Sequence, residues 1–425
     1  MGASATLSRM SAPSSAMSPG LVVLVLTLLL GIQPVTTDLY LPALPTLTQG
    51  FGASVAQAQF TLTALLLAFG VSQLVWGPLS DRFGRRPILI GGMVLYMLAT
   101  TGGAFSQSME QLIAWRTLQG VAMGAAVMCA RAIVRDLYAP SEGARMMSKG
   151  LTGLGVIACV SAPLGGVLSD HFGWRVALLA LSVFGAGTLA VLVTRFQESV
   201  PRLNPDALRP GPLLRNWAGI ARNPTFWAWT LLATGSYAGL FSYLASSSFV
   251  LIGVLGLSKT QYGLVMFTMS AVYIVGTVIC RRLLVRLGVR RTVGLAACVT
   301  LTGGTLVGVL PWLGVQNLWS VLLPFYLFML AHGVHQPCGQ SGAVAPFPHA
   351  AGAASALAGF IMMVVAFGIG GWLGLALADP ALGAGTVRPL TDSVWFWCVV
   401  ISTTAWTLVQ RHGEPHTPPT RVATT

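Results

Sequence analysis

The chain has 425 residues, of which 54% are hydrophobic and only 8% are charged, and its mean hydropathy is +0.75. Soluble domains carry roughly 25% charged residues, so this composition excludes a cytosolic enzyme, a secreted disulfide scaffold and a disordered chain. The net charge of +13 could suggest a nucleic-acid partner. However, the basic residues sit mostly in short gaps between apolar runs, so we expect no nucleic-acid partner and a chain embedded in membrane lipid.

Apolar runs recur along the whole sequence. A bilayer span needs about 20 apolar residues. Twelve runs of this kind are found, at residues 20–41, 57–76, 88–106, 110–135, 149–169, 174–195, 225–252, 262–281, 291–312, 316–342, 351–378 and 393–410. The first lacks a cleavage site of the A-x-A type and is interpreted as a retained span. We therefore expect an all-α polytopic membrane protein with twelve transmembrane helices.

The basic residues predict how these spans are oriented. Twenty of the 24 Lys and Arg residues would lie on one face of the membrane, against three on the other, and Arg116 falls within a span. Basic loops stay in the cytoplasm. We expect both termini to be cytoplasmic and the protein to be a multi-pass protein of the cell inner membrane.

A long gap at residues 196–224, rich in Arg and Pro and without apolar periodicity, divides the chain. It predicts a cytoplasmic central loop between two six-helix bundles, 20–195 and 225–410, with cytoplasmic tails at 1–19 and 411–425. A repeat supports the division, because the segment 82–86, Arg-Phe-Gly-Arg-Arg, resembles 286–291, Arg-Leu-Gly-Val-Arg-Arg, at an offset of 204 residues. Pseudo-symmetric halves that face each other across a midplane site are typical of transporters.

Asp38 is the carboxylate that this pattern places inside a span. An ionised carboxylate at membrane depth is costly unless it is paired, protonated or wetted, so it marks a functional site by default. The alternative is an interfacial residue at the end of the first span. Arg116, about six residues into the fourth span, lies at a similar depth. We expect the two side chains to be in contact, directly or through water, as a functional or a purely structural pair.

A charged turn, residues 77–87, joins the second and third spans. Gly77 and Gly84 allow close approach and positive φ, and Asp81 can cap a helix N-terminus. The arginines of this turn orient the protein in the membrane and can form ion pairs; they are Arg82, Arg85 and Arg86. A solvated charged loop is the alternative interpretation.

The fifth span contains Ala162, Pro163, Gly165 and Gly166. Small residues let helices approach closely, and a proline inside a helix removes a backbone hydrogen bond and bends it. The eleventh span, its counterpart, has small residues at 366, 370 and 374. Two interpretations stay open: simple helix packing, or a bend that helps to gate the outer side.

Other polar and aromatic side chains within the spans are candidates for lining a substrate cavity. These are Gln33, Tyr40, Tyr237, Tyr243, His332 and Gln336. A histidine inside a helix is more often a packed polar residue than a proton carrier, so a coupling role for His332 stays open.

One motif suggests an enzyme instead. Residues 339–342, Gly-Gln-Ser-Gly, match the G-x-S-G of an intramembrane serine protease. His335 and His332 point about 120° and 180° away from Ser341 around a helix, and His349 lies beyond the span. We therefore expect no enzyme. The six cysteines include no CxxC pair, so no metal site is expected either.

The motifs of residues 77–87, 112–120 and 162–166 together resemble the major facilitator superfamily, and in particular its twelve-span drug/proton antiporters. The segments 37–45, Thr-Asp-Leu-Tyr-Leu-Pro-Ala-Leu-Pro, and 345–357 are similar to the Bcr/CflA branch, which is associated with bicyclomycin and chloramphenicol resistance. The resemblance covers about residues 20–410.

The resemblance implies proton-coupled efflux by alternating access. By this likeness Asp38 is the carboxylate that exchanges protons with substrate, and Arg116 belongs to the proton relay. Asp81 would approach the N-terminus of the eleventh span, with Arg85 near Asp136, as a latch on the cytoplasmic side. Two departures are visible: Ala162 where glycine usually precedes the proline, and Val285 at the second-half position of the latch aspartate.

The expected function is therefore export of drug-like small molecules, driven by the proton gradient, by a monomer that needs no cofactor. A carrier of amino acids or short peptides with the same fold is the first alternative, and the intramembrane enzyme is the second.

Overall fold

The computed structural model describes residues 17–138, 140–205, 207–347 and 350–413, and all regular elements within these ranges are helices. The first half comprises α1 (Pro19–Asp38), η1 (Leu41–Ala43), α2 (Leu44–Phe51), α3 (Val55–Phe83), α4 (Arg85–Ala104), α5 (Met109–Leu137), α6 (Pro140–His171) and α7 (Trp174–Thr194). α8 (Pro210–Ala221) follows. The second half comprises α9 (Pro224–Ser247), η2 (Ser248–Val254), α10 (Lys259–Trp312), α11 (Leu318–Val344), α12 (Ala351–Ala376), η4 (Pro380–Leu382), α13 (Arg388–Trp406) and α14 (Leu408–His412).

Eleven helices in the described ranges are long and apolar enough to cross a membrane. α10 has 54 residues and is interrupted at Gly288, whose φ of 73° and ψ of 172° are not helical. It therefore carries two of the expected spans, the eighth and the ninth. Gly84, at the equivalent position of the first half, also has a positive φ, of 98°. The predicted all-helical fold with twelve spans is confirmed.

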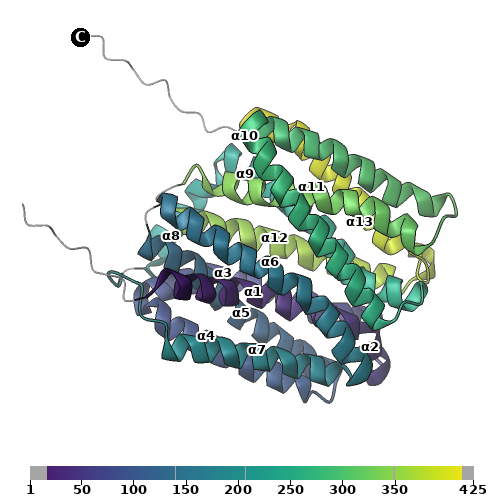
Figure 1. The fold of residues 1–425 in the computed structure, drawn as a ribbon, viewed down its shortest axis with the longest axis horizontal. Coiled ribbons are helices and arrows are strands. Elements are labelled where there is room, and N and C mark those ends of the chain that lie inside the picture. Colours follow the sequence, from purple (N-terminus) through teal and green to yellow (C-terminus); the bar gives the residue numbers. More distant parts are fainter. Residues whose placement is uncertain (1–16, 139, 206, 348–349, 414–425) are drawn as a thin grey trace, which may run out of the picture.

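The two halves lie against each other along two helix pairs (Figure 1). α3 packs on α12, where a Cβ at Gly370 would come within 1.8 Å of Thr63 Cγ2 and one at Gly374 within 3.0 Å of the Ala56 Cα. α6 packs on α10, and there a Cβ at Gly166 would lie 2.4 Å from the Lys259 carbonyl oxygen. Small residues thus permit backbone-to-backbone contact between the halves.

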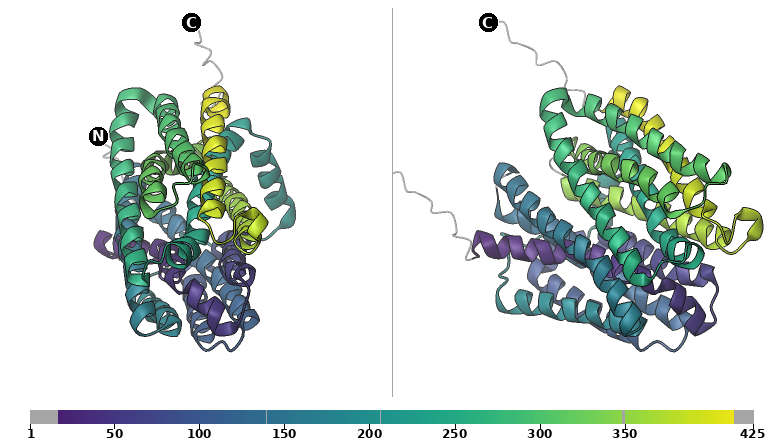
Figure 2. Two further views of the ribbon diagram at one scale, coloured as in Figure 1. Left: turned by 90° about the vertical axis from the view of Figure 1, so that its right-hand side faces the viewer. Right: turned by 45° about the vertical axis from the view of Figure 1, so that its right-hand side comes forward.

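α1 begins and α14 ends at the same end of the bundle, here called the terminal end; the other end is called the far end (Figures 1 and 2). α6 and α10 meet at the far end. There Lys259 Nζ donates to the Ser169 carbonyl oxygen at 3.0 Å, and the Asp170 carboxylate accepts from Thr260 N at 2.8 Å and Thr260 Oγ1 at 2.6 Å. These hydrogen bonds hold the halves together at the far end.

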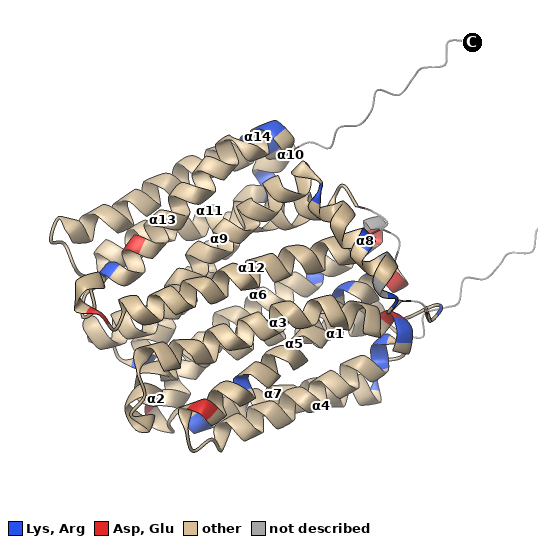
Figure 3. Cartoon of the chain, turned by 180° about the vertical axis from the view of Figure 1, so that it is seen from behind, with Lys and Arg blue, Asp and Glu red and all other residues tan. Residues whose placement is uncertain are grey.

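Lys and Arg gather at the terminal end of the bundle (Figure 3). The far end carries fewer of them, among them Arg175 at the start of α7, Lys259 at the start of α10 and Arg388 at the start of α13. The described residues thus have the asymmetric charge distribution that the sequence predicts.

The central segment 196–224 is not an irregular loop throughout, because it contains α8. Leu213, Trp217 and Ile220 share one face of this helix, and Ile220 is only 2% exposed. α8 packs against α12. The expected absence of apolar periodicity was wrong, since three apolar residues spaced by four and three already define a face. Most of the predicted tails 1–19 and 411–425 lies outside the described residues.

Candidate functional site

Asp38 is the last residue of α1 and lies between the two halves. It is partly exposed, and its Oδ1 accepts a hydrogen bond from Thr37 Oγ1 at 2.8 Å. Two tyrosines of the second half lie near enough to its carboxylate to be influenced by its charge, Tyr237 on α9 and Tyr262 on α10. Gln33, five residues earlier on α1, also faces Tyr237. Asp38, Gln33 and Tyr237 thus come together, as candidates for one polar site.

Arg116 on α5 does not form the ion pair with Asp38 that the sequence predicts. Its side chain is 1% exposed, and its guanidinium donates to the Thr36 carbonyl oxygen at 3.2 and 3.3 Å and to Gln119 Oε1 at 2.7 Å. It also lies 4.1 Å from the centre of the Tyr40 ring. The Thr36 carbonyl belongs to the last turn of α1, the negative end of the helix dipole. This dipole and the ring face take the place of the expected carboxylate.

Further polar side chains complete a buried network around Arg116. Gln119 Nε2 donates to Thr100 Oγ1 at 2.7 Å, and the hydroxyls of Tyr96 and Thr36 lie 2.7 Å apart. Sequence reasoning missed Gln119, Tyr96 and Thr36, because polar residues of a span show no partner until the helices are packed. Tyr40 was expected to line a cavity, but it is 1% exposed and bonded to Thr61 at 2.8 Å. It supports Arg116 instead.

Arg85 forms the centre of an ionic cluster at the terminal end. Its guanidinium lies 2.6 Å from Asp81 Oδ1 and 2.9 Å from Asp136 Oδ2, and it donates to Ser80 Oγ at 2.6 Å. Arg135 adds a contact of 3.6 Å to Asp81. Arg85 therefore joins α3, α4 and α5, with Asp136 as the resemblance implied.

The N-terminus of α4 is capped by Glu198, not by Asp81. The Glu198 carboxylate accepts from the backbone N–H groups of Arg85 at 2.9 Å and Arg86 at 3.0 Å. Gly84 is required there both by its φ of 98° and because a Cβ would lie 2.5 Å from Glu198 Oε2. The predicted cap at Asp81 was wrong, because this carboxylate is engaged by the arginines.

The remaining residues of the charged turn have other surroundings. Gly77 lies inside α3 with helical backbone, so the turn is confined to Gly84. Arg86 Nη2 donates to the Val193 carbonyl oxygen at 3.0 Å, and Arg82 lies over the Phe83 ring. Within the described ranges no hydrogen bond joins Asp81 to α12; the bond between α5 and α12 runs from Arg131 Nη1 to Ser355 Oγ, at 2.5 Å.

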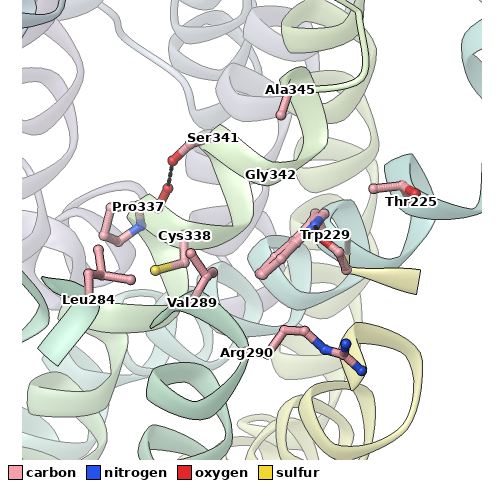
Figure 4. A pocket seen from close by; sticks show the side chains of 11 residues that line it. Thr225, Trp229, Leu284, Val289, Arg290, Pro337, Cys338, Ser341, Gly342 and Ala345 are labelled. Carbon is pink, nitrogen blue, oxygen red and sulfur yellow. Dashed lines mark hydrogen bonds between the residues drawn. The ribbon is translucent and has the colours of Figure 1, made fainter. Parts of the chain in front are cut away.

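The second half has a pocket where the first half has this ionic cluster. Leu284 and Val289 stand 204 residues after Ser80 and Arg85, and both line a pocket of about 430 Å³ at the terminal end (Figure 4). Val285, at the position of Asp81, is 89% exposed. The positions equivalent to Asp81 and Arg85 thus carry valines, Val285 and Val289, in place of charged residues.

The small residues of α6 face both the end of α1 and the first turns of α10. A Cβ at Gly165 would lie 2.3 Å from the Leu39 carbonyl oxygen, directly after Asp38. Gly166 faces Lys259, and the Cα of Pro163 would lie 2.7 Å from a Cβ at Gly263 of α10. Ala162 is 1% exposed, and its carbonyl oxygen faces the same glycine. The segment therefore connects the end of α1 with the second half.

Two of the predicted cavity residues lie in the core of the second half. Tyr243 is fully buried, with its ring centre 4.1 Å from that of Phe325. His332 is 3% exposed, and its Nδ1 lies 2.7 Å from Ser236 Oγ. Gln336 is partly exposed and reaches Met362 Sδ at 3.8 Å on α12.

Gln59 on α3 was missed by sequence reasoning. It donates from Nε2 to the Ala245 carbonyl oxygen of α9, across the two halves, and its Oε1 has no partner within the described ranges. It is 1% exposed. Gln59 therefore adds a polar contact between the halves, close to the first turn of α3.

The serine of the G-x-S-G motif has no base beside it in the described structure. Ser341 Oγ donates to the Pro337 carbonyl oxygen of its own helix (Figure 4). His335 Nε2 lies 3.0 Å from Thr300 Oγ1, and His332 Nδ1 is hydrogen-bonded to Ser236 Oγ. Among the described residues no group of three or more His, Cys, Asp or Glu side chains could hold a metal ion.

Comparison with known proteins agrees with this architecture. The sequence profile of the Major Facilitator Superfamily matches residues 26–371. The chain is 30% identical over 394 residues to Multidrug resistance protein D of Escherichia coli (strain K12), covering 93% of this chain and 98% of that protein. It is 26% identical over 385 residues to the Bicyclomycin resistance protein homolog of Haemophilus influenzae, covering 90% and 94%.

Solved structures share the fold. The crystal structure of a bacterial homolog to the human lysosomal transporter Spinster, in an inward-facing and occupied conformation, aligns with a TM-score of 0.70 at 17% identity. The alignment covers 92% of this chain and 97% of that one. The sequence-based resemblance is confirmed: the chain belongs to the major facilitator superfamily.

Proposed function

We propose that the protein exports drug-like small molecules in exchange for protons. The names of its relatives support the substrate class, since a multidrug resistance protein and a bicyclomycin resistance protein homolog align with at least nine-tenths of the chain. The absence of a base beside Ser341 among the described residues favours a transporter over an enzyme.

The observation that carries the proposal is the environment of Asp38. Its carboxylate is partly exposed between the halves, within electrostatic range of Tyr237 and Tyr262, and forms no ion pair within the described ranges. A carboxylate at membrane depth without a cation can alternate between charged and neutral forms as its exposure changes. Asp38 is therefore the group proposed to carry the proton, with Tyr237 and Gln33 beside it as substrate contacts.

Arg116 acts in this proposal through α1 rather than by direct pairing. It binds the Thr36 carbonyl oxygen, two residues before Asp38, while Thr37 donates to the Asp38 carboxylate. The last turn of α1 thus has a fixed cation on one side and the titrating carboxylate on the other. Movement of this turn on protonation would be transmitted to Arg116, whose Nε has no partner in the described part of the chain.

The contact between α6 and the end of α1 links proton binding at Asp38 to the relative position of the two halves. Leu39 follows Asp38 and faces Gly165, and Gly166 faces Lys259 of α10. In the proposed cycle a proton from outside neutralises Asp38 and weakens its hold on substrate. The carrier then opens at the terminal end, where substrate binds and the proton leaves, and this exchange favours the return.

The orientation follows from charge. Lys and Arg gather at the terminal end (Figure 3), which the positive-inside rule assigns to the cytoplasm. We propose that both termini are cytoplasmic, in a cell inner membrane, and that the ionic cluster of Arg85 latches this side. A monomer driven by the proton gradient and needing no cofactor is consistent with this scheme.

Proton release on drug binding tests the proposal. Purified, detergent-solubilised protein is titrated with candidate compounds in weakly buffered medium, and Asp38→Asn is compared with Asp392→Asn. Asp392, on α13, is bonded to Trp312 and lies near Arg388, so it serves as a control carboxylate. Release that occurs in the wild type and the control but is lost in Asp38→Asn is expected. Equal release by all three proteins would contradict the role of Asp38.

A further inference from the structure

A small cavity between the halves lies toward the terminal end, away from Asp38. It has a volume of about 30 Å³ and is walled by α5 of the first half and by α9, α11 and α12 of the second. Its polar lining consists of Arg131, Thr230, Gln340 and Ser355, and none of the described carboxylates lines it. The remaining lining is apolar or glycine. A volume of this size accommodates a group of a few atoms.

Arg131 brings an uncompensated positive charge into this cavity. Its Nη1 donates to Ser355 Oγ at 2.5 Å across the halves. In the described part of the chain, no ion pair joins Arg131 to a carboxylate. Arg85 and Arg135, which lie at the same end of the bundle, do form ion pairs with carboxylates. A guanidinium has five N–H donors. A cation held at membrane depth without a counter-charge is costly, so the site favours an anion.

Thr230 is a second, independent indication of a ligand. It lies on α9, is fully buried, and its hydroxyl has no hydrogen-bond partner among the described residues although it lines the cavity. Ser355, in the second turn of α12, lines the same cavity and accepts the hydrogen bond from Arg131. Guanidinium, hydroxyl and amide groups therefore converge on one small space from four helices.

This site is distant from the proton site. Arg131 lies 15 residues after Arg116 on α5, which corresponds to about 22 Å along the helix. Arg116 lies at the level of Thr36 and hence of Asp38. One small group cannot bind Asp38 and Arg131 together, so the cavity is a separate subsite nearer to the terminal end.

We propose that Arg131, Thr230 and Ser355 form a subsite for the carboxylate, or a comparable oxyanion, of a transported compound. The proposal rests on the proposed function, in which compounds enter from the terminal end. A guanidinium forms two parallel hydrogen bonds with a carboxylate, and the Thr230 hydroxyl can donate a third. The subsite would make Arg131 a specificity-determining residue that favours anionic compounds over their neutral isosteres.

Benzoate and its neutral isostere benzamide are the probes. Their dissociation constants are measured by calorimetry on the full-length, detergent-solubilised protein at low ionic strength. We expect benzoate to bind more tightly than benzamide, and R131Q to weaken benzoate binding at least tenfold without changing benzamide binding. R131K keeps the positive charge but not the paired N–H donors of the guanidinium. R131K and Thr230→Val should each weaken benzoate binding less than R131Q does. R145Q removes the same charge from an exposed position on α6 and is the matched control.

Three outcomes would overturn the subsite: equal affinity for the two probes in the wild type, unchanged benzoate affinity in R131Q, or an equal loss in R145Q. R131K and Thr230→Val keep the test decisive if R131Q fails to fold. The proton-release titration separates this proposal from the proposed function. If benzoate binding is lost in R131Q but no compound releases protons, the subsite stands and antiport fails. If drugs release protons but R131Q binds benzoate normally, the subsite alone fails.

Discussion

Replacement of Gly165 by alanine should disturb the protein at the end of α1, where the proposed proton carrier lies. A Cβ at this position would be 2.3 Å from the Leu39 carbonyl oxygen, whereas ordinary contact begins at 3.4 Å. α6 and the end of α1 must therefore separate by about 1 Å. Overpacking costs about 1–3 kcal/mol, and a contact with backbone belongs to the upper part of this range. The helix-propensity gain of about 1 kcal/mol offsets part of it.

Gly155, on the same helix, supplies the matched control. The nearest atom to a Cβ there is Ile274 Cδ1, at 4.0 Å. Gly155→Ala should stabilise the protein by up to about 1 kcal/mol, and Gly165→Ala should destabilise it by about 2 kcal/mol. The free energy of unfolding is measured by titration with a denaturing detergent in mixed micelles, followed by tryptophan fluorescence. Equal stability of the two variants would refute the close contact between α6 and Leu39.

Three further predictions follow from individual contacts. Glu198→Ala should destabilise the protein by about 1–2 kcal/mol, because α4 loses its cap; an unchanged free energy of unfolding would contradict this role. Asp170→Asn should loosen the far end, where Asp170 holds Thr260; faster thiol labelling of a cysteine introduced there is expected, and unchanged labelling would count against it. Diamide should link Cys280 to Cys338, whose sulfur atoms lie 3.8 Å apart; mass spectrometry that finds both thiols free would contradict the packing of α10 on α11.

The fold could be predicted from the sequence because lipid imposes a simple requirement on each span. About 20 apolar residues are needed whatever the neighbours are, so hydropathy alone located the spans. Hydropathy also separated the two spans within α10, and the structure places the break between them at Gly288, the position equivalent to Gly84. α8 was missed because its apolar face has only three residues and packs on α12.

The partners of the charged residues were harder to predict, because they depend on helix packing. Asp38 was identified by its rarity in a span, but its supposed partner Arg116 binds a carbonyl oxygen and an aromatic ring. Neither kind of partner can be recognised from residue type. Glu198, which caps α4, stands 113 residues from Arg85 and looks like any loop carboxylate. Arg131 appeared as one more basic residue until the second half was packed against it.

The most direct test of the central claim is uphill drug transport driven by a pH gradient alone. Inverted vesicles or proteoliposomes containing the wild type, Asp38→Asn or Asp392→Asn are loaded so that only a proton gradient is available. Accumulation of a drug that releases protons from the purified protein is then followed. We expect accumulation with the wild type and with Asp392→Asn that collapses when the gradient is dissipated, and none with Asp38→Asn. Uphill accumulation by Asp38→Asn would contradict the account.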